Sequence, residues 1–130
     1  MQTFEVETDS RLGVLDITDA VETALSGSAT GTATVFVRHT TAAVTVNEPE
    51  SRLLGDLAAA LDELVADTGW EHDALDGNAD AHIRALLVGP DVTVPVVDGS
   101  LALGTWQAVL LLECDGPRTR TVQVIPPERE

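Results

Sequence analysis

The chain is organised around the segment Arg38-His39-Thr40-Thr41-Ala42-Ala43-Val44-Thr45-Val46-Asn47-Glu48, which has polar residues at both ends of an apolar run. The run predicts a core strand, and the residues before it alternate with a period of two. This alternation places His39 on the face that carries Val35 and Val37. A histidine on such a face is either a core residue hydrogen-bonded to the backbone or part of a site. The segment leaves both interpretations open.

The remaining elements are read from periodicity and turn residues along a chain of 130 residues, long enough for one domain, 1–130, with its own core. Strands are expected at 4–7, 13–17, 30–39, 42–47, 92–97 and 101–103, in a buried run ending at Cys114, and at 119–125. Helices are expected at 18–27, 49–65 and 79–88, the last with Ile83, Leu86 and Leu87 on its inner face. Asp98-Gly99 is a hairpin signal, whereas 67–77 is expected to be a long loop of a kind that often carries function.

Charge limits the classes of partner. The sequence has 22 acidic residues, seven arginines and no lysine, which gives a net charge of −15. Nucleic acids and anionic membranes require a positive field that this composition cannot supply, and Schiff-base chemistry on lysine is excluded. This charge balance is typical of a protein in a salt-rich cytoplasm. The equally weighted alternative is a GC-rich genome that encodes arginine in place of lysine.

No segment predicts export or membrane insertion. The longest apolar run, 108–112, is far shorter than the roughly 20 residues of a membrane-spanning helix, and the N-terminus resembles no signal peptide. The single cysteine, Cys114, cannot form an intramolecular disulfide and is expected to be buried and inert. A cytoplasmic location is therefore expected.

Three histidines stand at expected element boundaries: His39, His72 and His82. Three imidazoles with an open fourth position are the ligand set of a catalytic zinc site. The spacings of 33 and 10 residues match no local metal motif, so three unrelated histidines remain the alternative on spacing alone.

Four blocks of the sequence follow one another at compatible spacing: Phe36-Val37-Arg38-His39-Thr40-Thr41-Ala42-Ala43-Val44-Thr45-Val46-Asn47-Glu48, Trp70-Glu71-His72-Asp73, Ala81-His82-Ile83-Arg84, and Pro95-Val96 through Gly104-Thr105-Trp106-Gln107 to Glu113. Together they resemble the YjbQ-type family, whose members are described as secondary thiamine-phosphate synthases. The resemblance implies an α+β fold with a β-sandwich-like core of mostly antiparallel strands, two to three flanking helices and a homotrimer. It also implies that the three histidines share a divalent metal, with zinc favoured and magnesium possible.

The resemblance implies a site that joins hydroxymethylpyrimidine diphosphate to thiazole phosphate, where the chief demand is to stabilise the leaving diphosphate. The expected metal ligands are His39, His72 and His82, and the expected catalytic residues are Glu48, Glu71 and Arg84. Substrate binding is assigned to Thr40, Thr41, Asn47, Asn78, Gly104, Thr105 and Gln107. Two positions depart from the family pattern: Arg84 stands where a lysine is common, and Trp70 stands where a tyrosine is usual.

Two alternatives remain open at this point. Bound zinc would lower the pKa of water to about 7, so Glu48 or Glu71 could serve as the base of a metal-dependent hydrolase acting on a small phosphorylated metabolite. The other alternative is a trimer that binds such a ligand without catalysis. Three imidazoles are a poor match for magnesium, which prefers oxygen ligands, and this weighs against synthesis as the main activity.

Overall fold

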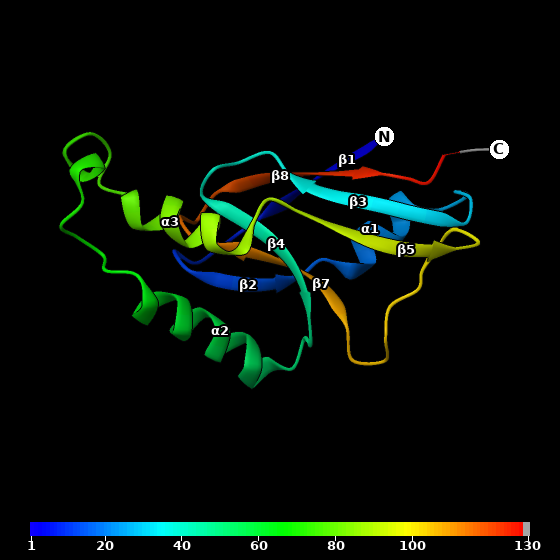
Figure 1. Cartoon of the computed structure of the whole chain (residues 1–130), viewed down its shortest axis with the longest axis horizontal. Coiled ribbons are helices and arrows are strands. Elements are labelled where there is room, and N and C mark those ends of the chain that lie inside the picture. Colours follow the sequence, from blue (N-terminus) through cyan, green and yellow to red (C-terminus); the bar gives the residue numbers. More distant parts are fainter. Residues whose placement is uncertain (129–130) are drawn as a thin grey trace.

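A computed structural model describes residues 1–128 of the chain (Figure 1). The helices are α1 (Thr18–Ala24), α2 (Ser51–Leu64) and α3 (Ala79–Val88), with a short 3-10 turn, η1 (Glu71–Ala74). The strands are β1 (Gln2–Glu7), β2 (Gly13–Asp16), β3 (Gly31–Val37), β4 (Ala42–Asn47), β5 (Asp91–Val97), β6 (Ser100–Leu101), β7 (Ala108–Glu113) and β8 (Thr119–Ile125). This confirms the α+β class. None of the described helices is long and apolar enough to cross a membrane.

Two antiparallel sheets enclose the main core. One has five strands in the order β1-β8-β3-β5-β6, and the other has three in the order β2-β7-β4. Their facing sides contribute one cluster of buried side chains, which includes Val35, Val94 and Val122 from the first sheet and Val44, Val109 and Leu111 from the second. The sheets therefore form the β-sandwich-like core that the resemblance implies.

A second, smaller core lies between the three-stranded sheet and the helices α2 and α3. Ala43, Leu112 and Cys114 pack there against Leu61 and Ala85. Because β7 carries core residues on both faces, every one of its side chains is buried. The expected burial of Cys114 is confirmed, and burial raises the pKa of its thiol to about 11, which disfavours the reactive thiolate.

The expected inner face of α3 is wrong. The buried residues of α3 are Ala79, Asp80, Ala81, Arg84 and Ala85, whereas Leu86 is 77% exposed and Leu87 is 58% exposed. Periodicity assigned the leucines to the core because it counts only apolar residues. The structure turns the helix so that Arg84 faces inward, where partners for its guanidinium lie, and the leucines face away from the sheet.

Candidate functional site

An open pocket of about 600 Å³ lies beside the start of β4. Three parts of the chain meet there: the link 38–41 between β3 and β4, the first residues of β8, and the start of α3. They meet because β8 pairs with β3 and because α3 packs on β4. The pocket is lined by polar and charged side chains: Arg38, His39, Thr40, Thr41, Asp76, Asn78, His82, Arg118, Thr119 and Arg120. We call it the His82 pocket.

His39 is half-buried at the end of the β3–β8 ladder. Its Nε2 accepts a hydrogen bond of 2.7 Å from the backbone N–H of Thr121, in place of the carbonyl that a longer β3 would offer. Burial, together with the charge of Arg120, lowers the pKa of His39 below its ordinary value. A neutral ring that accepts at Nε2 carries its proton on Nδ1, and neither nitrogen then offers a lone pair to a metal. The structure favours the backbone-bonded interpretation of this histidine.

The floor of the pocket is a buried ion pair between Arg120 and Glu113. Arg120 donates to both Glu113 carboxylate oxygens, and its Nη2 also donates to the carbonyl oxygen and hydroxyl of Thr41, at 3.1 and 2.9 Å. Burial alone would raise the pKa of Glu113, but the hydrogen bonds from Arg120 and Thr8 outweigh it, and the pKa lies below its usual value. The guanidinium of Arg120 therefore fixes the positions of Glu113 and Thr41 beneath the pocket.

Two other arginines are better placed to meet a ligand. Arg38 is exposed, and its guanidinium makes no hydrogen bond or ion pair within residues 1–128. Arg118 is half-exposed and donates to the carbonyl and the carboxylate of Asp115, each at 2.8 Å. Thr40 adds an exposed hydroxyl on the same rim. The rim therefore offers phosphate the unpaired guanidinium of Arg38 and Nη1 of Arg118, which has no partner within residues 1–128.

His82 also borders a second, mainly apolar pocket of about 550 Å³, lined by Trp70, Glu71, His72, Ala79 and Ile83 as well. The rings of His72 and His82 are 5.1 Å apart between centroids and almost perpendicular, with an interplanar angle of 89°. Nε2 of His72 is buried without a hydrogen-bond partner, and its nearest carboxylate, Asp76, lies 3.7 Å away. An unpartnered buried nitrogen of this kind is an available metal ligand.

The residues fit the implied metal in part. Two imidazoles on one tetrahedral zinc have centroids about 5 Å apart, since Zn–N bonds are about 2.0–2.1 Å long. His72 and His82 match this spacing. His39 does not match while it accepts from Thr121. Within residues 1–128, the chain forms no group of three or more histidine, cysteine, aspartate or glutamate side chains placed to hold a metal.

Two further residues of the expected site are Asn78 and Glu71. Asn78 lines the His82 pocket, whereas Glu71 does not. Asn78 donates from Nδ2 to Asp115 at 2.9 Å and has a buried, unpartnered Oδ1. The N–H of Ala79, the first helical amide after it, is taken by Asp73 at 3.3 Å. Glu71 lines the apolar pocket beside His72.

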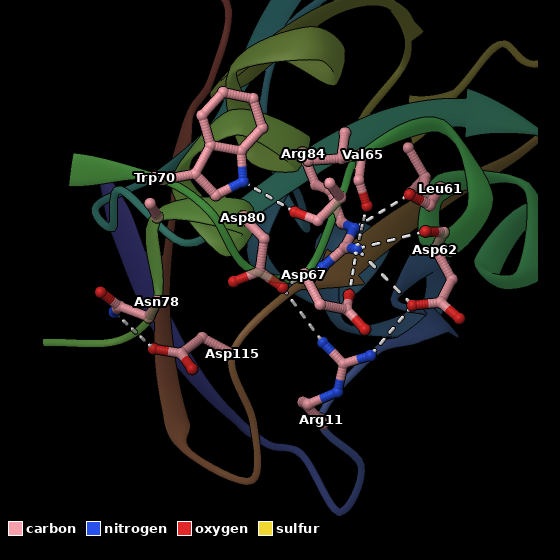
Figure 2. A network of polar contacts seen from close by, with 12 residues as sticks. Arg11, Leu61, Asp62, Val65, Asp67, Trp70, Asn78, Asp80, Arg84 and Asp115 are labelled. Carbon is pink, nitrogen blue, oxygen red and sulfur yellow. Dashed lines mark hydrogen bonds and ion pairs between the residues drawn. The ribbon is translucent and has the colours of Figure 1, made fainter. Parts of the chain in front are cut away.

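Arg84 does not line either pocket; it lies at the centre of a separate polar network (Figure 2). Its guanidinium is fully buried, pairs with Asp80 and with Asp67 at 2.8 Å, and donates to the carbonyls of Leu61 and Val65 at 2.9 and 2.7 Å. The hydrogen bond from Arg84 lowers the pKa of Asp67. Each nitrogen of the Arg84 guanidinium donates to a protein group, so in this structure Arg84 ties the end of α2 to α3 away from both pockets.

The other expected site residues lie at the far end of β4. Asn47 closes that strand opposite Ala108, and its Oδ1 accepts from the N–H of Glu48 at 2.8 Å. The turn 104–107 leads into Ala108 and contains the remaining three: Gly104, Thr105 and Gln107. A strand of six residues is roughly 17–20 Å long, so these groups cannot meet the His82 pocket of the same chain. In Figure 1 the segment entering β7 and helix α3 lie at different ends of β4.

Sequence reasoning missed Arg118, which directly precedes β8, and Arg120, which lies in its first residues. Arg118 and Arg120 stand two residues apart and therefore point to one side of a strand. With Arg38 they make three of the seven arginines of the chain. In a chain without lysine, two arginines on one side of a strand were the sequence signal that could have indicated an anion site.

Fold and pocket together define a small two-sheet α+β protein with an arginine- and histidine-lined pocket. The family model described as "UPF0047 protein YjbQ-like" matches residues 2–126. The chain belongs to this family.

Relatives and solved structures agree along nearly the whole chain. A UPF0047 protein of Archaeoglobus fulgidus is 49% identical over 92% of this chain and 94% of its own, and one of Methanothermobacter thermautotrophicus is 45% identical over 95% and 88%. The crystal structure of a hypothetical protein from Aeropyrum pernix K1 superposes with a TM-score of 0.94 at 46% identity, covering 98% of each chain. A YbjQ-like protein of unknown function from Sulfolobus solfataricus P2 gives 0.89 at 38% identity, over 98% of this chain and 96% of that one.

Proposed function

We propose that the His82 pocket binds the phosphate groups of a small phosphorylated molecule. The observation that carries this proposal is the open rim formed by Arg38, Arg118 and Thr40 in a chain of net charge −15. An anion would be repelled by most of such a surface and attracted only where cations gather. The buried pair of Glu113 and Arg120 below keeps this rim in place.

The reaction we propose is thiamine-phosphate synthesis, as the resemblance implies. The two guanidinium groups of Arg38 and Arg118 would neutralise diphosphate as it leaves the pyrimidine methylene carbon and the thiazole nitrogen forms the new bond. The apolar wall containing Trp70 and Ile83 would hold the rings beside the phosphates and exclude water. A divalent metal, zinc in preference to magnesium, would bind His72 and His82 and supply further charge stabilisation. The homotrimer implied by the resemblance is part of the proposal.

A metal-dependent hydrolase is the second candidate, and one observation favours it. Glu71 lines the same apolar pocket as His72, whose Nε2 has no hydrogen-bond partner. A carboxylate beside a metal ligand is placed to take a proton from water. Synthesis and hydrolysis are separated by supplying hydroxymethylpyrimidine diphosphate with and without thiazole phosphate and measuring thiamine phosphate and released phosphate.

Phosphate binding is tested by calorimetric titration with inorganic pyrophosphate. Arg38→Ala and Arg118→Ala are each expected to weaken binding about tenfold or more, because a hydrogen bond to a charged group contributes about 1.5–3 kcal/mol. Arg52→Ala is the matched control. Arg52 is an exposed arginine at the start of α2, and its substitution removes the same charge. An equal loss of affinity in all three variants would show that overall charge, and not this pocket, attracts the anion.

Metal binding is tested by equilibrium dialysis against zinc and elemental analysis. His72→Ala and His82→Ala are expected to abolish binding of one zinc per chain, because each removes one of the two paired imidazoles. His39→Gln is expected to retain it, since the glutamine carbonyl can still accept from Thr121. Loss of zinc in a folded His39→Gln variant would mean that His39 leaves the backbone to become a third ligand.

A further inference from the structure

We propose that the His82 pocket of one copy is completed by a second copy, which seats its turn 104–107 against α3 with Trp106 as the anchor. The inference deepens the proposed function because it concerns the same pocket. It explains how polar groups at the two ends of β4 could belong to one site.

The turn 104–107 is built as a rigid, uncharged projection. Trp106 is 72% exposed at its tip. The N–H of Gly104 donates to Oε1 of Gln107 at 2.8 Å, and the N–H of Gln107 donates back to the carbonyl of Gly104 at 3.0 Å. No charged residue occurs from 100 to 112. Because these two bonds order the turn backbone before association, little backbone entropy is lost on binding, and the indole of Trp106 contributes a large contact area, as interface anchors do.

A matching apolar surface surrounds His82. Leu86 and Leu87 are exposed on α3. Leu86 also lines a pocket of about 330 Å³ together with Ala42, Ala85 and Pro90, and this pocket is bordered by the polar residues His39, Thr40 and His82. An aromatic ring placed there would cover the leucines and narrow the open side of the His82 pocket.

Charge and reach identify the occupant as a second copy. The turn cannot fold back to its own α3, because the length of β4 separates them. A chain of net charge −15 repels its own copies over most of its surface, and the contact of an uncharged turn with the apolar residues of α3 avoids that repulsion. A contact between different surfaces of identical chains closes into a ring when the rotation between neighbours allows it, and a ring of three is the homotrimer of the proposed function.

Tryptophan fluorescence tests the contact directly. The chain has two tryptophans, so Trp70→Phe leaves Trp106 as the sole emitter. Acrylamide quenching and sedimentation velocity are measured over the same dilution series, at physiological and at high potassium chloride. We expect the quenching constant of Trp106 to fall several-fold, with a blue shift, as the chain associates. A monomer at every concentration, or an assembly in which Trp106 is quenched as readily as in the monomer, would overturn the proposal.

Mixed assemblies test whether the contact completes the site. His82→Ala and Trp106→Ala are each expected to reduce pyrophosphate binding, and rings mixed from equal amounts should regain about a quarter of the sites, where an intact pocket meets an intact turn. Leu75→Ala, which truncates another exposed side chain outside the pockets, is the control and should leave association unchanged. No recovery of binding in mixed rings would refute completion by a second copy. Burial of Trp106 without any pyrophosphate binding by the unmodified chain would instead refute the proposed function.

Discussion

Glu113→Gln is expected to lower the free energy of unfolding by about 3–5 kcal/mol, because it leaves the buried charge of Arg120 without its counter-ion. Both side chains are almost completely inaccessible to water. Arg120 keeps its bonds to Thr41, so the loss arises from the ion pair and from the bond that Thr8 donates to the carboxylate. Urea denaturation at neutral pH measures the change.

The same pair predicts a dependence on pH. The pKa of Glu113 is lower in the folded protein than in the unfolded chain, so its contribution is complete above the unfolded value of about 4.3. That contribution is lost as the pH falls through the folded pKa. The difference in stability between the unmodified chain and Glu113→Gln should therefore narrow in acid.

Glu63→Gln is the matched control for this pair. Glu63 is an exposed residue of α2, so its replacement is expected to change stability by no more than about 0.5 kcal/mol. A loss below about 1 kcal/mol for Glu113→Gln would place this pair in the range of solvent-exposed salt bridges and contradict its buried geometry.

Arg84→Met is expected to lower the free energy of unfolding by a similar amount, about 3–5 kcal/mol. It leaves the buried carboxylate of Asp80 and two backbone carbonyls without a hydrogen-bond donor. Arg84→Lys should cost less, since an ammonium keeps the charge but offers three donors where the guanidinium offers five. Arg11→Ala is the control, because Arg11 joins the same network from the half-exposed side and should cost at most about 1 kcal/mol.

Thermal unfolding ranks these three variants, and pyrophosphate titration of Arg84→Lys separates structure from function. A folded Arg84→Lys variant with unchanged pyrophosphate affinity is expected, because Arg84 lies outside both pockets. A tenfold loss of affinity at unchanged stability would return Arg84 to the site that its sequence position suggested.

Most helices and strands of this protein can be predicted from its amino-acid sequence, although the 3-10 turn Glu71–Ala74 lies in a segment expected to be a loop. Local signals suffice for this: β4 and β8 have the bounds that the apolar runs predict, and α3 spans the residues expected between Asn78 and Gly89. At Asp98-Gly99 both residues have positive φ, 48° and 79°, as the hairpin signal requires. Period and turn chemistry act over a few residues, so one sequence is enough to read them.

Which polar side chains meet depends on how the elements pack against one another. His39 is bound to Thr121 because β8, 82 positions further along the chain, lies beside β3. Arg84 faces inward because carbonyls of α2 reach it, and this turns Leu86 outward. Asn47 is separated from the histidines because β4 is extended between them. Such outcomes depend on hydrogen-bond partners distant in sequence, and a residue's type and spacing do not specify which partners folding will place within reach.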